Sequence, residues 1–225
     1  MALDEHLDMT LREWIQHFQD RVVQTELHYR GVTILKNVMD LWVYQELIHR
    51  TRPEVVIEIG SKHGGSALWF ADTLSWIGGE VLSIDLKSPS LEAAGAVRPG
   101  NLTFLEGDSV APATVDAVRS WCRGRRALVV ADGDHSADHV VKELELYSEW
   151  VPAGGYFIVE DGVVDVMRWQ PFCPGPVEGV RRFLATRDDF EVDPDCEKMI
   201  LTYNPGCFLR RTRRGPTPCD RTSAS

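Results

Sequence analysis

Apolar residues change their spacing along the chain near residue 50, from a helical period to short continuous runs. Before that point they recur every three or four positions, so residues 1–50 are predicted to form a helical cap with a break at Gly31. Beyond it, β-branched and other apolar residues form five runs that predict buried strands, at 55–59, 81–85, 102–105, 127–131 and 156–159. Helical stretches accompany them, at 66–76, 113–122, 139–150 and 177–186.

Alternation of strands and helices, with strands that are apolar throughout, predicts a mainly parallel sheet with helices on both faces, an α/β architecture. The turn sequence Asn204-Pro205-Gly206 predicts a C-terminal antiparallel hairpin of strands 198–203 and 208–210. We expect residues 51–211 to form this domain. Residues 212–225 are polar and are predicted to be a disordered tail.

The composition limits the partners that the chain can have. It has 225 residues, enough for one large domain, and its 24 Lys and Arg against 34 Asp and Glu give a net charge of −10. That charge disfavours binding to nucleic acid or to an anionic membrane. No apolar run approaches the roughly 20 residues of a membrane helix, and the first residues do not resemble a signal peptide. Five dispersed cysteines without a CxxC pair indicate reduced thiols, so we expect a cytoplasmic protein.

The loop that follows the first predicted strand, Gly60-Ser61-Lys62-His63-Gly64-Gly65-Ser66, is typical of a nucleoside site. Its glycines permit a sharp turn and a close approach of the backbone to a ligand. The dinucleotide pattern GxGxxG is incomplete because Lys62 stands at the middle glycine, which disfavours a pyrophosphate. The alternative is an ordinary strand–helix turn.

Asp85 ends the second predicted strand, where a carboxylate can accept hydrogen bonds from both hydroxyls of a ribose. Asp108 and Ser109 follow the third strand, where a short polar side chain is expected to meet an adenine edge. The alternative for Asp85 is a solvated residue at the end of a strand.

Acidic residues follow the fourth and fifth strands: Asp132 after one, Glu160 and Asp161 after the other. If these strands are neighbours, the three carboxylates converge and must protonate or bind a cation. Oxygen ligands favour Mg²⁺, Mn²⁺ or Ca²⁺ over Zn²⁺. His135 lies nearby, and histidine suits a general base at neutral pH. The alternatives are solvated acids that splay apart and a histidine that only supports a helix terminus.

Together these motifs resemble the cephalosporin hydroxylase/rhamnosyl O-methyltransferase family, class I S-adenosylmethionine-dependent enzymes of antibiotic and glycolipid tailoring. The resemblance covers about residues 28–211. The residues that carry it are Gly31, Lys36, the segments 40–46 and 58–66, Asp132 to His135, Glu160 and Asp161, and the segments 201–206 and 209–211.

The resemblance implies a Rossmann-like class I methyltransferase fold and an enzyme that uses S-adenosylmethionine and Mg²⁺ to methylate a small-molecule hydroxyl, on a sugar or an antibiotic intermediate. Mg²⁺ is expected on Asp132, Glu160 and Asp161, with His135 as the base, as in related macrolide-sugar O-methyltransferases. Relatives commonly assemble, so a homo-oligomer is expected. The residues expected to hold the cofactor are Glu58, Gly60, Ser61, Gly64, Ser66, Asp85, Asp108, Ser109 and Asp132.

Other functions remain open at this point. A catechol-type acceptor competes with a sugar hydroxyl, and the sequence does not decide between them. A nicotinamide-dependent oxidoreductase is disfavoured by Lys62 in the glycine loop. A catalytically idle nucleoside-binding scaffold of a biosynthetic complex is disfavoured by the acidic cluster, which is costly to bury. Trp169 and Phe172 are interpreted either as core residues or as the wall of a substrate pocket.

Overall fold

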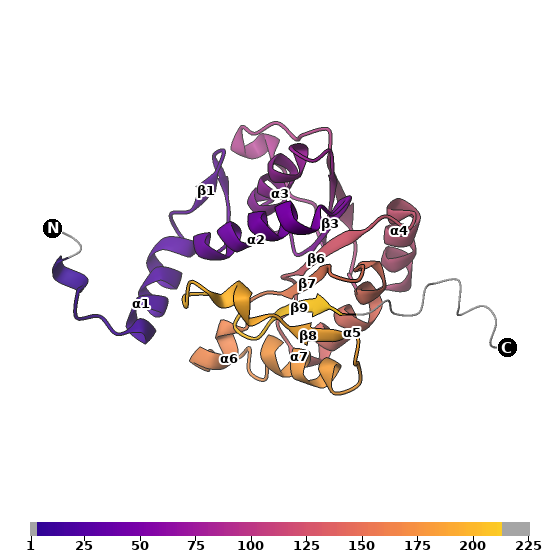
Figure 1. Cartoon of the computed structure of the whole chain (residues 1–225). Coiled ribbons are helices and arrows are strands. Elements are labelled where there is room, and N and C mark those ends of the chain that lie inside the picture. Colours follow the sequence, from indigo (N-terminus) through magenta and orange to yellow (C-terminus); the bar gives the residue numbers. More distant parts are fainter. Residues whose placement is uncertain (1–3, 213–225) are drawn as a thin grey trace.

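The computed structural model describes residues 4–212, apart from the side chain of Ala93. These residues fold around a seven-stranded sheet (Figure 1). The strands of this sheet are β3 (Val55–Ile59), β4 (Glu80–Asp85), β5 (Leu102–Glu106), β6 (Ala127–Ala131), β7 (Tyr156–Val159), β8 (Phe190–Val192) and β9 (Phe208–Arg211). The α-helices are α1 (Leu11–Phe18), α2 (Val38–Thr51), α3 (Gly65–Ser75), α4 (Pro112–Cys122), α5 (Ala137–Tyr147), α6 (Val163–Met167) and α7 (Pro176–Leu184). Shorter turns of helix are η1 (Asp4–His6), the π-helical η2 (Gln19–Val23), η3 (Glu92–Ala94), η4 (Ser148–Trp150) and η5 (Pro194–Glu197).

The strand order is β5-β4-β3-β6-β7-β9-β8, with the first five strands parallel and β9 antiparallel to both of its neighbours. The chain runs outward from β3 through β4 to β5 and then returns to β6 on the other side of β3. The order therefore reverses between β3 and β6. Ligands of open α/β sheets bind beyond the carboxyl ends of the strands at such a reversal.

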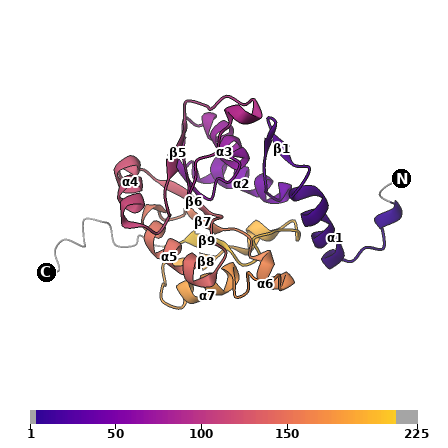
Figure 2. The ribbon, with the colours of Figure 1, turned by 180° about the vertical axis from the view of Figure 1, so that it is seen from behind.

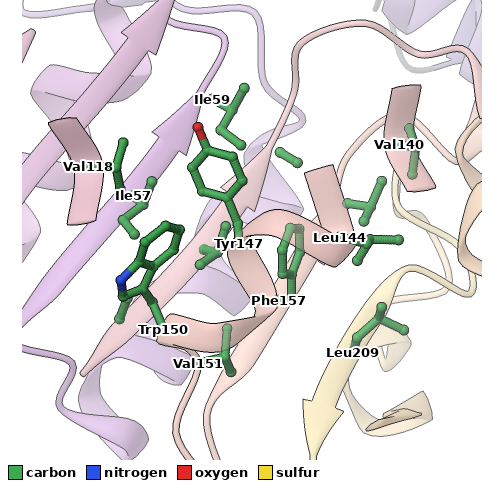
Figure 3. Close-up of a cluster of buried hydrophobic side chains, with 14 of the residues drawn as sticks. Ile57, Ile59, Val118, Val140, Leu144, Tyr147, Trp150, Val151, Phe157 and Leu209 are labelled. Carbon is green, nitrogen blue, oxygen red and sulfur yellow. The ribbon is translucent and has the colours of Figure 1, made fainter. Parts of the chain in front are cut away.

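Helices cover both faces of the sheet, and the central strand β3 is buried on both sides (Figures 1 and 2). Ile57 and Ile59 face α4, α5 and α7, in the cluster that includes Tyr147 and Trp150 (Figure 3). Val56 faces α2 and α3. Burial on both faces explains why these strands are apolar throughout. The predicted α/β architecture with a mainly parallel sheet is confirmed.

The first 50 residues are less helical than predicted. A two-stranded hairpin, β1 (His28–Tyr29) with β2 (Val32–Thr33), separates η2 from α2. Its turn residues, Arg30 and Gly31, both have positive φ (51° and 81°). This combination is required by the tightest hairpin turns, and glycine adopts it without strain. Gly31, predicted as a break between helices, is therefore the corner of a hairpin.

The C-terminal hairpin forms, but with a different partner strand. β9 pairs with β8 at 190–192, whereas the predicted strand 198–203 is irregular. Ile200 has a φ of 65°, which a strand does not accommodate. Thr202 and the backbone N–H of Tyr203 bond instead to the carboxylate of Asp40. The prediction of a strand at 198–203 was wrong, because the contact with the distant Asp40 outweighs the local apolar pattern.

Three further predictions concern cysteines, membrane helices and the tail. Cys122, Cys173, Cys196 and Cys207, the cysteines of the described part, are free thiols. Among residues 4–212, no helix combines the length and the apolar character needed to span a bilayer. The predicted disordered tail lies, from residue 213 onward, outside the described residues.

Candidate active site

A cleft of about 920 Å³ opens beyond the carboxyl ends of β3, β4, β6 and β7, at the reversal of strand order. Most of the residues selected from the sequence line it, although they come from five separate segments. The predicted residues in its wall are Gly60, Ser61, Ser66, Asp85, Asp108, Ser109, Asp132, His135 and Asp161. Glu58, Gly64 and Glu160 lie behind the wall and do not line the cleft.

The loop between β3 and α3 forms one side of this cleft from backbone atoms. Gly60 has a φ of 94°, and a Cβ at this position would collide with the carbonyl oxygen of Asp132, which follows the neighbouring strand β6. Lys62 donates its backbone N–H to Asp85 Oδ2 at 2.7 Å. The hydroxyl of Ser61 is buried and has no hydrogen-bond partner among the described residues. The loop thus brings a turn, a carboxylate and an unpaired hydroxyl to one wall.

Glu58 stands behind this loop as a completely buried carboxylate. One of its oxygens accepts from Ser83 Oγ at 2.5 Å, and the other has no partner in the described chain. Burial raises its pKa, while Lys36 and the hydroxyls of Ser66 and Ser83 act in the opposite direction. Glu58 therefore braces β3 against β4 and does not face the cleft directly.

The β3–α3 loop and Asp85 form one half of the cleft, the loop half. Its far end holds a network that the sequence did not indicate. Ser109 Oγ donates to Glu143 Oε1 at 2.6 Å, and His139 Nε2 lies 3.1 Å from the same oxygen. Hydrogen bonding to Glu143 raises the pKa of His139. Tyr147 donates its hydroxyl to the carbonyl oxygen of Ser109 at 2.8 Å. The Ser109 hydroxyl is therefore engaged within the protein, while the neighbouring Asp108 is exposed on the cleft wall.

Three groups gather at the opposite half, beyond β6 and β7. One ligand atom from each of Asp132, His135 and Asp161 lies within 4.8 Å of the others. His135 Nε2 is 3.3 Å from Asp161 Oδ2. Burial, followed by the charge of Asp132, raises the pKa of Asp161 to about 6. A carboxylate pair that repels in this way is typical of a site that receives a cation.

Glu160 lies beside this group but is not part of it, because both of its oxygens are bound by other side chains. Lys36 Nζ lies 2.7 Å from Oε2, and the Tyr44 hydroxyl donates to Oε1 at 2.8 Å. Burial raises the pKa of Glu160 well above its ordinary value, although Lys36 acts against this. The three carboxylates expected to bind metal thus divide into two on the cleft wall and one behind it.

Lys36 also contacts Asp132, so its ammonium bridges the two strand-end acids. Burial by itself lowers the pKa of this amine, but the carboxylates of Asp132, Glu160 and Glu58 outweigh it and raise the pKa. Lys36 was noted in the sequence only as part of a resemblance. A single lysine after an apolar run, at the start of a helix, carries no local sign of a buried ion pair.

An outer wall of aromatic residues completes the acidic half. The ring of Phe172 packs edge-on against His135, with centroids 5.7 Å apart. Trp169 donates its indole N–H to Gln16 Oε1 of α1 at 2.8 Å, so the N-terminal helix is tied to the loop after α6. Trp169 and Phe172 both line the cleft, which favours the pocket interpretation over a core role.

Comparison with known proteins gives one family. The profile of the family described as Rhamnosyl O-methyltransferase/CmcI matches residues 21–212. Rhamnosyl O-methyltransferase of Mycobacterium tuberculosis (strain H37Rv) is 31% identical over 211 residues, which cover 91% of this chain and 86% of that protein. The enzyme of the same name from Mycobacterium leprae is 32% identical over 211 residues, which cover 91% of this chain and 91% of that protein.

Solved structures with similar folds are methyltransferases. A structure of CmcI with Mg and SAM has a TM-score of 0.64 at 23% identity, over 92% of this chain and 86% of that one. MycE methyltransferase from the mycinamycin biosynthetic pathway, in complex with Mg and SAH, has a TM-score of 0.54 at 18% identity, over 78% of this chain and 50% of that one. At these identities the likeness establishes the class I methyltransferase fold.

Proposed function

This chain belongs to the rhamnosyl O-methyltransferase/CmcI family and is an S-adenosylmethionine-dependent O-methyltransferase, and we propose that it methylates a small-molecule hydroxyl with the help of Mg²⁺. A sugar hydroxyl, free or on an antibiotic intermediate, is the acceptor that the names of the relatives favour. The observation that carries the proposal is the position of Asp132, His135 and Asp161 in the same cleft as the glycine loop and Asp85.

The residues of the loop half fit S-adenosylmethionine. The backbone at Gly60 leaves no room for a side chain, and the buried Ser61 hydroxyl lacks a partner in the described chain that a ligand could supply. Asp85 uses one oxygen for Lys62 N–H and has the second for a ribose. Asp108 lies where an adenine edge is expected, on the exposed part of the wall.

The acidic half fits Mg²⁺. Asp132 and Asp161 offer carboxylate oxygens, the donors that this ion prefers. Glu160, predicted as a third ligand, is held by Lys36 and Tyr44 and would have to exchange one of these contacts for the metal. Asp132 and Asp161 are therefore the stronger candidates.

When bound, S-adenosylmethionine supplies an electrophilic methyl group, and Mg²⁺ supplies a Lewis acid that favours the deprotonated form of an acceptor hydroxyl. His135 would accept the hydroxyl proton, and the Asp161 carboxylate, 3.3 Å from Nε2, would stabilise the imidazolium that results. The edge of Phe172 restricts rotation of the imidazole ring. Trp169, together with Gln19 and Val23 of η2, lines the cleft beside this group and would shield the acceptor side from water.

Thermal unfolding with added ligands tests the proposal. The midpoint is measured with S-adenosylmethionine, S-adenosylhomocysteine or NAD, each with Mg²⁺ or with a chelator. A ligand at about 100 times its dissociation constant stabilises the native state by roughly 2.7 kcal/mol, which is easily detected. We expect a shift with the first two ligands and a separate Mg²⁺ shift that Asp161→Asn removes. A shift with NAD alone would overturn the proposal, and no shift with any ligand would contradict both the cofactor site and the metal site.

Turnover with panels of sugar and catechol acceptors then identifies the acceptor class, and light scattering tests the expected homo-oligomer. The cytoplasmic location stays a prediction from the sequence.

A further inference from the structure

The acidic half of the cleft already contains a cation, the ammonium of Lys36. Its side chain is only 3% exposed, and Nζ contacts Asp132 Oδ2 and lies 2.7 Å from Glu160 Oε2. The residue follows strand β2 and precedes Asn37, whose side chain caps α2. The lysine therefore enters the site from the N-terminal segment, which packs over the sheet rather than forming part of it.

The position of Lys36 divides the acidic cluster into an inner and an outer part. The inner part is Glu160, whose second oxygen accepts from the Tyr44 hydroxyl, so neither oxygen faces the cleft. The outer part is Asp132 and Asp161, whose side chains are 17% and 30% exposed, with His135 beside them. A divalent cation that enters from the cleft meets the outer part first and has the ammonium directly behind it.

Hydrogen bonds fix this arrangement from several distant segments. Asn204 donates to the Tyr44 hydroxyl at 2.7 Å and accepts from the backbone N–H of Asp161 at 3.0 Å. The inner and outer carboxylates are thus held in register by one network. Without a cation among them, the carboxylates would repel each other across a poorly hydrated space.

We propose that Lys36 is a positioning residue for the metal, a built-in counter-cation that holds Asp132 and Glu160 together before Mg²⁺ arrives and limits how tightly Mg²⁺ then binds. The inference rests on the proposed function, since it concerns the same site. Two effects follow from one charge: the metal-free protein is stabilised by attraction between Lys36 and the carboxylates, and the metal-bound protein is destabilised by repulsion between Lys36 and the metal.

Replacement of the charge separates these effects. Lys36→Met keeps the length and the apolar stem of the side chain and removes the ammonium. We expect the metal-free variant to unfold at a lower temperature, and its affinity for Mn²⁺, used as a spectroscopic substitute for Mg²⁺, to increase by about tenfold or more. Both are measured without cofactor or acceptor, by thermal unfolding and by electron paramagnetic resonance of free Mn²⁺.

Lys142→Met is the matched control, since it removes one positive charge from the exposed face of α5. We expect its metal affinity and its midpoint to stay close to those of the parent protein. Lys36→Arg retains the charge and should not gain affinity. If Lys36→Met does not fold, Lys36→Gln serves in its place, because its amide still donates to one carboxylate.

The outcomes distinguish this inference from the function on which it rests. If the parent protein binds Mn²⁺ and Lys36→Met binds it equally or more weakly, Lys36 is not a counter-cation that limits affinity, while the metal-dependent function stands. If neither the parent protein nor any variant binds Mn²⁺ or Mg²⁺, the proposed metal site itself is wrong. Tighter binding confined to the uncharged Lys36 variants supports the inference.

Discussion

The two halves of the cleft are built in different ways. The loop half is built on backbone from one short segment, 60–65, braced by Asp85 at the end of the adjacent strand, with the network of Ser109, His139 and Glu143 at its far end. The acidic half is made of side chains that follow β6 and β7 and of Lys36 from the N-terminal segment. Asn204 from the C-terminal region joins them. One half depends on local turn chemistry, and the other on contacts between residues up to 160 positions apart.

This difference predicts which kinds of substitution each half tolerates. A backbone cradle is sensitive to added bulk. A buried polar network is sensitive to the loss of any member, since each loss leaves a partner unsatisfied. Substitutions in one half should therefore leave the ligand of the other half largely unaffected; two of the following experiments test this separation, and two test contacts that hold the cleft and the segments around it.

The largest effect is expected in catalysis, from His135→Ala. Loss of a general base should lower kcat by about 10²- to 10⁴-fold while the affinity for S-adenosylhomocysteine stays unchanged. His139→Ala is the control in the loop half, where it should change cofactor affinity more than kcat. Kinetics and calorimetry measure the two quantities. An unchanged kcat in His135→Ala would remove this residue from the base role.

A large effect on stability is expected from Gly60→Ala, because the added methyl collides with the backbone of Asp132 at a φ of 94°. We expect the free energy of unfolding to fall by roughly 3 kcal/mol or more. Gly78→Ala is the control, since Gly78 has a φ of 74° but open space around it, and should cost about 1 kcal/mol. Equal costs in urea unfolding would contradict the collision.

A smaller effect concerns pH and Asp40, which holds the 202–203 segment against α2. Burial raises its pKa to about 7, although bonds from Thr202 and Tyr203 oppose this. Between about pH 4 and pH 7 the native state therefore binds more protons than the unfolded state, so the free energy of unfolding falls as pH rises. Asp40→Asn, whose side chain is neutral at every pH, should lose this slope, a change on the order of 2 kcal/mol or more across the window. The free energy of unfolding is measured in urea at several pH values. The same pH dependence in both proteins would refute this prediction.

The smallest effect is expected from Tyr44→Phe, which leaves Glu160 Oε1 and the Asn204 amide without their shared partner. The free energy of unfolding should fall by about 1–2 kcal/mol, and Mg²⁺ binding should change while cofactor affinity does not. Tyr147→Phe removes a matched buried hydroxyl that donates to Ser109 in the loop half. It should show the opposite pattern, and an identical response of both ligands to both variants would break the separation of the halves.

Much of the fold follows from the sequence because its signals are local. The strands at 55–59, 127–131 and 156–159 have the predicted bounds, and those predicted at 81–85 and 102–105 are one residue longer, since continuous apolar runs between turn residues have few alternatives. The three-residue strand β8 and the five-residue helix α6 were missed, because so few residues show no period. The hairpin at 28–33 was missed because flanking helical periodicity concealed its turn.

For the site, local sequence signals were enough to identify the chemical groups that are available. Strand-end positions alone identified the glycine loop, Asp85 and the acids Asp132 and Asp161, because parallel strands present their carboxyl ends at one edge of the sheet. The pairing of these groups with one another followed from the three-dimensional fold alone. It directed Glu160 toward Lys36 and Tyr44 and left His135 beside Asp161. Such pairings depend on distances between segments remote in the chain, which no local pattern encodes, and they are decided by the need of every buried charge for a partner.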